Sequence, residues 1–244
     1  DLNKESSQIE LFKEKRENIV YDIHHQEDKW LIITNQDDAA KGKLMSASVD
    51  DTGTWKNVFD YCDQIKMINL DAFKDFSILL VEINGLHYFW LMHSNGKVSP
   101  IQNLEISWAL HKSVNRVYES RYYRYLYESP LTPLTLMELD TETMNTTILE
   151  ADKVTDYKRD LYRINRLQIP GSTSEITVLK RNDTEKTADV VCFSESVSSN
   201  QVCTFNQELL KKVDEKTIYI LSHLQFENEE AKKQCLEFVK KSNF

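Results

Sequence analysis

The sequence predicts a mainly β protein in which blades of a β-propeller are followed by a small α/β segment. Three observations carry this prediction. Short β-rich runs separated by turn residues occur in groups of four between residues 18 and 150. The dipeptides Asn84-Gly85 and Asn95-Gly96 supply the positive φ angles that type I′ hairpin turns require. Apolar residues with helical spacing occur beyond residue 205, where strands and helices alternate.

The β-rich runs define the predicted blades. Each run is rich in β-branched or aromatic residues and is bounded by turn residues. The runs are residues 19–24, 30–34 and 43–49, then 65–70, 76–83, 86–92 and 97–101, then 114–119, 121–127, 135–139 and 146–149. No crisp motif, such as a Trp-Asp dipeptide, recurs at a fixed period, so a sandwich or a meander with the same strand spacing stays open.

The pattern changes near residue 160, where an α/β order begins. Strands are expected at 161–169, 174–180, 188–193 and 216–223, and amphipathic helices at 206–213 and 227–242. We therefore divide the chain into an N-terminal extension (1–17), a partial set of propeller blades (18–160) and an α/β segment (161–244).

The composition is that of a chain with a packed core. Of 244 residues, 41% are hydrophobic and 10% aromatic, which excludes a disordered chain. Lys and Arg number 30 against 39 Asp and Glu, and this acidic balance disfavours nucleic acid as a partner. No run approaches the roughly 18 apolar residues that a membrane-spanning helix needs.

The cysteines and the first residues bear on the compartment. The four cysteines have neither C-x-x-C nor zinc-ligand spacing, so we expect reduced, mostly buried thiols and no metal or other cofactor. Residues 1–7 are polar and acidic and do not form a secretory signal. Because residue 1 is not Met, we expect the numbering to start inside a longer or processed chain. These features favour a cytoplasmic protein. The cysteines are Cys62, Cys192, Cys203 and Cys235.

Several short segments match one family in their order and spacing. They are 21–25 (YDIHH), 30–35 (WLIITN), 39–40 (AA), 44–45 (LM), Trp55, 70–75 (LDAFKD), 127–133 (YESPLTP) and 166–180. Together they resemble the prolyl oligopeptidase and oligopeptidase B family of serine peptidases. The resemblance covers most of residues 18–180. It implies a propeller that limits substrate size, followed by the start of an α/β-hydrolase domain that cleaves oligopeptides through a Ser-His-Asp triad.

The sequence departs from that family in four places. Pro170-Gly171 stands where the family usually has Asp-Gly, and residues 192–196 (CFSES) stand where it has a Gly-rich segment. Residues 224–227 (LQFE) stand where Arg-Gly-Gly is usual. No G-x-S-x-G occurs, and Gly171 is the last glycine of the chain. A nucleophile elbow needs small residues at a strained turn, so we expect no catalytic residue here and no peptidase activity of the chain alone.

Three groups of residues could suggest chemistry, and a packing role is favoured for each. His24 and His25 are adjacent in a strand and point to opposite faces, so they do not easily share a metal ion. His223 has no carboxylate or thiol partner at a recognisable offset. Alternating aromatic and basic residues could stack on nucleic-acid bases, but they are more simply a strand with one buried face. This last group is Arg121, Tyr122, Tyr123, Arg124, Tyr125 and Tyr127.

Two further groups of nucleophilic side chains were weighed. Cys192 and Cys203 could form a disulfide across a loop, although two buried thiols are the simpler interpretation. Several serines lie in a polar, Gly-free stretch, and none has a base at a motif distance, so none is named as a nucleophile. These serines are Ser194, Ser196, Ser198 and Ser199. The sequence thus predicts no catalytic, cofactor-binding or metal-binding residue.

Three functional hypotheses follow. The first is a partial or degenerate prolyl oligopeptidase-like peptidase chain whose propeller gates oligopeptide access. The second is a non-catalytic binding or scaffold subunit, and the third is an unrelated β-rich interaction module. Three blades leave open edges, so we expect the rest of the polypeptide, or a separate chain, to complete the fold. It would contact the N-terminal blade edge and the final strand near residues 218–220. An oligopeptide or protein is the expected partner.

Overall fold

The computed structural model spans residues 1–244 and describes most of them. The described residues are Phe12, Glu14, 16–168, 175–182, 191–195, 203–214, 218–222, Glu230, Lys233, Gln234, Glu237 and Phe238. Within them, no helix is long and apolar enough to cross a membrane.

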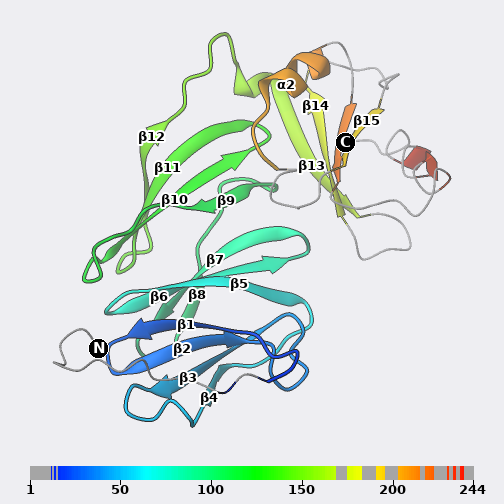
Figure 1. Ribbon diagram of the computed structural model, residues 1–244. Helices are drawn as coiled ribbons and strands as arrows, with labels where there is room; N and C mark the ends of the chain where they lie inside the picture. Colours follow the sequence, from blue (N-terminus) through cyan, green and yellow to red (C-terminus); the bar gives the residue numbers. More distant parts are fainter. Residues whose placement is uncertain are drawn as a thin grey trace. The chain divides into compact units, whose positions relative to one another are not determined.

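Three four-stranded sheets follow one another along the chain (Figure 1), as the predicted groups of four required, although only three strands were predicted for the first group. In each sheet, strands that are consecutive in sequence are neighbours in space. The first sheet contains β1 (Tyr21–Gln26), β2 (Lys29–Thr34), β3 (Lys43–Ser48) and β4 (Lys56–Phe59). The second contains β5 (Ile65–Ala72), β6 (Phe76–Ile83), β7 (Leu86–His93) and β8 (Val98–Pro100). The third contains β9 (Ala109–Lys112), β10 (Tyr122–Ser129), β11 (Thr132–Asp140) and β12 (Thr146–Ala151).

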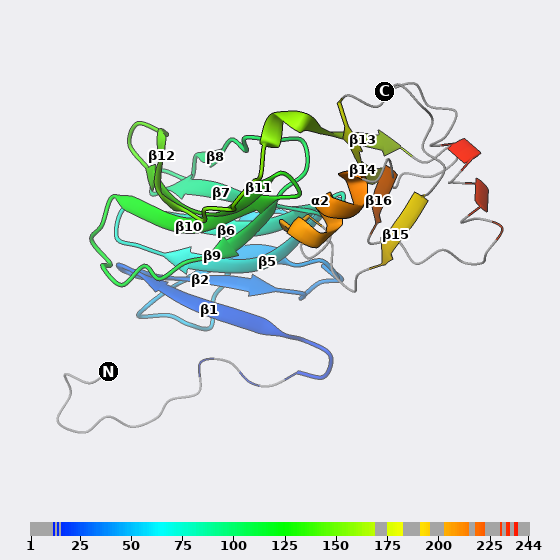
Figure 2. The same ribbon diagram turned by 90° about the horizontal axis from the view of Figure 1, so that it is seen from above.

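The fourth sheet is mixed and confirms the α/β character of the later part. After a 3-10 turn, η1 (Arg159–Leu161), it contains β13 (Tyr162–Gln168), β14 (Glu175–Arg181), β15 (Val191–Glu195) and β16 (Ile218–Ser222). The strand order is β13-β14-β16-β15, with β16 antiparallel to β14 and parallel to β15. The helix α2 (Gln207–Asp214) lies against β14 and β16 (Figure 2).

The position of β16 limits how a completing chain could make the contact expected near residues 218–220. This strand is paired on both sides. An additional strand therefore cannot pair with it, and the edges of this sheet lie at β13 and β15. The predicted helix at 206–213 is confirmed as α2. Of the predicted helix at 227–242, the five described residues are helical and the others lie outside the described residues.

The third blade shows where strand prediction was wrong. Residues 114–119 were predicted as a strand, but they are irregular and end in a turn. The side chain of Asn115 explains this, because it accepts from the Arg124 N–H and donates to the Arg124 carbonyl, both at 2.8 Å. A side chain thus replaces the backbone pairing that a strand would have made here. The pairing strand is β9, which sequence reasoning missed, as it did β4.

The two Asn-Gly turns differ from each other. Asn84 and Gly85 both have positive φ, 50° and 74°, as the predicted type I′ turn requires. At the second turn only Gly96 has positive φ, so the expected type I′ turn is wrong there. That loop is longer, since the His93 N–H donates to the Lys97 carbonyl and the Gly96 N–H donates to that of His93.

The chain divides into two compact units. The first comprises residues 1–81 and 90–99, and the second comprises 82–89 and 100–244. In the first unit, Ile32, Met45 and Ala47 form a buried cluster beneath aromatic side chains. In the second unit one buried cluster joins the β10–β11 turn to β13, β14 and α2 through Leu131, Tyr162, Leu179, Leu210 and Val213. Within this second unit, the third blade and the fourth sheet therefore share a core.

Candidate functional site

The best-defined polar centre of the second unit is the buried carboxylate of Glu105. Its side chain is 7% exposed and lies in the segment between β8 and β9. Oε1 accepts from Arg159 Nη2 at 2.6 Å and Nε at 3.2 Å, and from Thr132 Oγ1 at 2.9 Å. This hydrogen-bonded contact raises the pKa of the Arg159 guanidinium. The carboxylate thus ties the β8–β9 segment to the third blade and to the turn before β13.

Two tyrosines lie close to this carboxylate. Burial, reinforced by the negative charge of Glu105, raises the pKa of Tyr127 above its usual range. Burial likewise raises the pKa of Tyr157, whose hydroxyl donates to the Leu131 carbonyl at 2.6 Å. Both phenols therefore stay protonated at neutral pH and serve as donors or packing groups, not as bases.

A second buried polar contact links the β8–β9 segment to β14 and to the residues before α2. The Ser107 hydroxyl lies 2.9 Å from Thr177 Oγ1 on β14 and 3.0 Å from the Sγ of Cys203. Cys203 is a free, buried thiol, and burial raises its pKa. A reactive cysteine needs a lowered pKa, so this thiol is a packing group and a weak hydrogen-bond partner.

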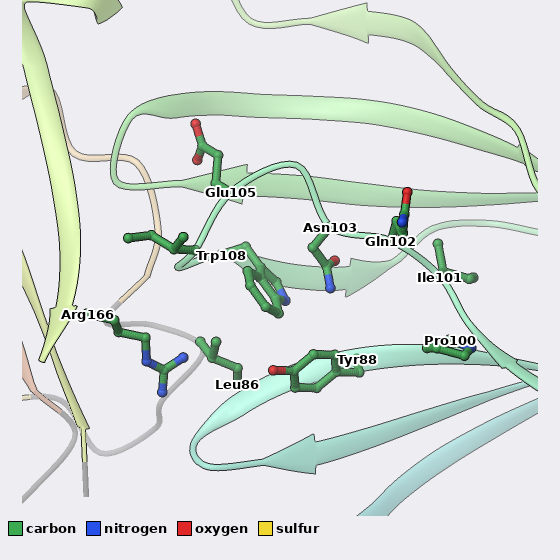
Figure 3. A pocket seen from close by; sticks show the side chains of 10 residues that line it. Leu86, Tyr88, Pro100, Ile101, Gln102, Asn103, Glu105, Trp108 and Arg166 are labelled. Atoms are coloured by element: carbon green, nitrogen blue, oxygen red, sulfur yellow. The ribbon is translucent and has the colours of Figure 1, made fainter. Parts of the chain in front are cut away.

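A pocket of about 490 Å³ opens beside these contacts (Figure 3). It is lined by residues of β7, of the end of β8, of the segment before β9 and of β13. Arg166 lies at one end beside Leu86, Pro100 and Ile101 lie at the other, and aromatic rings stand between. The lining residues are Leu86, Tyr88, Pro100, Ile101, Gln102, Asn103, Glu105, Ile106, Trp108 and Arg166.

Short-range contacts hold the walls of this pocket. The Trp108 indole N–H donates to the His87 carbonyl at 2.6 Å, and the Tyr88 and Trp108 rings meet edge to face at 5.1 Å. The Ile101 N–H donates to the Phe89 carbonyl at 2.9 Å, which fixes the start of the following segment to β7. Arg166 Nη2 donates to the Asn84 carbonyl at 2.7 Å. The pocket is therefore largely preformed.

His24 and His25 are ordinary strand residues of β1. His24 and His25 point to opposite faces of β1: His24 Nε2 lies 3.2 Å from Asp22 Oδ2, and the His25 ring lies 4.9 Å from the Trp30 ring. No group of three or more potential metal ligands occurs among the described residues. His223 lies outside the described residues.

The aromatic strand is confirmed as a packing element. Tyr123, Tyr125 and Tyr127 are buried on one face of β10, whereas Tyr122 on the other face is exposed. Their rings are therefore not available for stacking on bases. Arg124 on the exposed face pairs with a neighbouring carboxylate, its Nε lying 2.8 Å from Glu138 Oε2. Arg121 likewise pairs with Asp140 and Glu142.

The structure describes only some of the remaining nucleophile candidates. Cys203 is a free thiol, so the Cys192–Cys203 disulfide is not formed. Cys192 and Ser194 lie on β15, of which the structure describes the backbone alone. Ser196, Ser198 and Ser199 lie outside the described residues. Sequence reasoning did not identify the pocket or Glu105, because their partners are far apart in sequence: 54 positions separate Glu105 from Arg159.

Three consecutive four-stranded sheets that lead into a mixed sheet define a propeller-type β protein joined to an α/β segment. The family model described as "Prolyl oligopeptidase, N-terminal beta-propeller domain" matches residues 1–152. The chain therefore belongs to the prolyl oligopeptidase family, which confirms the resemblance seen in the sequence.

Relatives and a solved structure agree with this assignment. The chain is 28% identical to Protease 2 of Moraxella lacunata over 172 residues, covering 70% of this chain and 25% of that protein. It is 23% identical to dipeptidyl aminopeptidase BI of Pseudoxanthomonas mexicana over 219 residues, covering 86% and 30%. Its fold is similar to that of oligopeptidase B from Trypanosoma brucei in a closed form with covalently bound antipain: the TM-score is 0.76 at 17% identity, covering 90% of this chain and 33% of that one. The chain thus spans about a quarter to a third of the proteins it matches.

Proposed function

We propose that this chain is a section of a prolyl oligopeptidase-like serine peptidase in which the blades at 18–160 gate the access of oligopeptides to a catalytic centre. Residues 1–17 are then an extension of the blades, and residues 161–244 begin the hydrolase-like domain. The match of residues 1–152 to the propeller domain of this family is the observation that carries the proposal. The peptidase names of the relatives, and the inhibitor bound to oligopeptidase B, support it.

The catalytic residues of such an enzyme would come from outside these 244 residues. The chain has no G-x-S-x-G, and a nucleophile elbow depends on those small residues. The chain also spans only part of its relatives. The completing polypeptide is then the rest of the same protein or a separate chain. A cytoplasmic location is part of this proposal, and the free thiols of Cys62 and Cys203 support it.

The alternative is a non-catalytic binding or scaffold protein of the same fold. It is favoured by the residues at 192–196 and 224–227, which replace segments that are glycine-rich in active members. Glycines of that kind let backbone N–H groups approach a ligand closely. The two functions share the fold and differ only in turnover.

Labelling with a serine-directed fluorophosphonate distinguishes the peptidase function from the scaffold function. The natural, full-length protein that contains this chain is expected to be labelled at one serine, and a peptide substrate is expected to block the labelling. Residues 1–244 expressed alone are expected to stay unlabelled. A labelled serine within residues 1–244 would overturn the assignment of catalysis to the rest of the protein. A full-length protein that is folded but never labelled would establish the scaffold alternative.

A further inference from the structure

The dipeptide Asn-Gly is chemically labile, and the chain contains it twice. Because glycine has no side chain, the backbone nitrogen after the asparagine can approach the asparagine Cγ without a steric barrier. The copies are Asn84-Gly85, between β6 and β7, and Asn95-Gly96, between β7 and β8 (Figure 1). The residue types are identical in both, so the local structure decides which copy reacts.

The first copy is held by its surroundings. β6 ends at Ile83 and β7 begins at Leu86, so Asn84 and Gly85 are the whole turn between two strands of 8 residues each. Both have positive φ, and Arg166 Nη2 donates to the Asn84 carbonyl at 2.7 Å. That carbonyl belongs to the peptide unit whose nitrogen would have to swing toward the side chain. The paired strands and the guanidinium together therefore oppose rotation about the Asn84 Cα–C bond.

The second copy lies in a longer and more exposed turn. Residues 94–97 separate β7 from β8, all of them are exposed, and β8 has only 3 residues. A methyl group added at Gly96 would meet nothing within 4 Å among the described residues other than its chain neighbours. The turn thus has room for a ring to form beside Gly96 and for water to reach it.

Two hydrogen bonds in this turn act on its reactivity in opposite directions. The Lys97 N–H donates to Asn95 Oδ1 at 2.9 Å, which polarises the side-chain carbonyl and stabilises the negative charge that develops on its oxygen during attack. The Gly96 N–H donates to the His93 carbonyl at 2.9 Å and must be released before its nitrogen can attack. Because Gly96 is exposed, water replaces the lost bond, and this local opening costs less than the opening of the β6–β7 turn.

We propose that Asn95 is a site of spontaneous deamidation and that the fold protects Asn84. The Gly96 nitrogen forms a bond to Asn95 Cγ, the Cγ–Nδ2 bond breaks, and Nδ2 leaves as ammonia with the hydrogen that the Gly96 nitrogen gives up. Water then opens the resulting succinimide: opening at the side-chain carbonyl gives aspartate, and opening at the main-chain carbonyl gives isoaspartate. Water is the only co-reactant, and the reaction does not depend on the proposed peptidase activity.

The modification would alter the turn that joins β7 to β8. Either product adds a negative charge, and isoaspartate also adds a methylene group to the main chain. The His93 N–H donates to the Lys97 carbonyl at 2.9 Å across this turn, and a longer main chain between the two residues changes that geometry. We therefore expect the isoaspartate form to melt at a lower temperature than the Asn95→Asp variant, which has the same charge and an unaltered main chain.

Peptide mapping compares the two sites in one sample. Trypsin cleaves after Lys74 and Lys97, so both asparagines fall in the single peptide 75–97, and its fragment ions assign the modified position. The folded full-length protein is incubated in water enriched in heavy oxygen and then digested in ordinary water, so that only conversion during the incubation carries the label. We expect Asn95 to be converted at least about tenfold faster than Asn84, the effect of one additional hydrogen bond that must open at Asn84. Both aspartate and isoaspartate are expected as products.

Unfolding and substitution separate the effect of the fold from that of the dipeptide. In denaturant the two asparagines should be converted at similar rates, because each is then followed by an unconstrained glycine. Asn95→Gln should remove the fast conversion, since glutamine must close a larger ring, and Asn84→Gln is the matched control that should leave it unchanged. In the folded protein, conversion of Asn84 as fast as that of Asn95, no conversion of Asn95, or aspartate without isoaspartate would each overturn the proposal.

Discussion

Two aromatic clusters, one in each compact unit, use similar residues in different surroundings. In the second unit, Phe89 meets Tyr123 and Tyr125 edge to face, and all three are buried. In the first unit, Phe12 contacts Tyr21, Trp30 and Trp55, and the four are only partly buried over a small apolar cluster. We call these the tyrosine cluster and the tryptophan cluster, respectively.

The difference shows that aromatic content alone does not measure how much an element is stabilised. The tyrosine cluster lies among strands that are hydrogen-bonded on both sides, and each ring loses nearly all contact with water. In the tryptophan cluster, part of the apolar surface is covered by Phe12, a residue of the predicted N-terminal extension. Because hydrophobic stabilisation follows the apolar area removed from water, the tyrosine cluster should contribute more.

Truncation of the two phenylalanines tests this comparison most directly. Phe89→Ala, at a side chain 1% exposed, is expected to lower the free energy of unfolding by about 3–5 kcal/mol. Phe12→Ala, at a half-buried side chain, is expected to cost about 1 kcal/mol. Denaturant unfolding of both variants measures the difference. A loss for Phe12→Ala as large as that for Phe89→Ala would show that the tryptophan cluster is the stronger one.

Removal of the Glu105 carboxylate tests the polar link within the second unit. Glu105→Ala leaves Thr132 and Arg159 without their shared acceptor, and we expect the free energy of unfolding to fall by about 2 kcal/mol. The loss is not larger because the half-exposed Arg159 regains contact with water. Glu142→Ala, which removes an exposed partner of Arg121, is the matched control and should leave stability unchanged. Equal results for the two variants in thermal unfolding would assign no stabilising role to the Glu105 contact.

The buried tyrosines are expected to have the smallest effect on the free energy of unfolding near neutral pH. Their ionisation is followed directly by ultraviolet absorption. Burial raises the pKa of Tyr125 from its ordinary value near 10 to about 12. The folded chain therefore keeps a proton that the unfolded chain loses, and the stability from this group is full below pH 10 and falls as the pH rises from about 10 toward 12. An ultraviolet titration of the folded protein should show that the ionisation of Tyr125 is displaced upward from pH 10 toward pH 12. Ionisation of all tyrosines near pH 10 in the folded protein would contradict this.

The sequence predicted the strands with the clearest local signals. The run at 76–83 is β6 within the same bounds, because continuous apolar residues end at an Asn-Gly turn that fixes the hairpin. The four-residue strands β4 and β9 were missed, since they are too short to show a period. The strand predicted at 114–119 failed because the Asn115 side chain takes the place of backbone pairing, which residue pattern does not reveal.

What the sequence by itself determined is the class of the protein: the groups of four strands, the α/β change near residue 160, and the family, all of which depend on local pattern and motif order. What only the tertiary structure decided is the interior position of β16, the Glu105 contacts and the pocket. Arg166 and Asn84 are 82 positions apart, and Ser107 and Thr177 are 70 apart. Such contacts form only after strands from distant parts of the chain have packed together, so periodicity within a short window carries no trace of them.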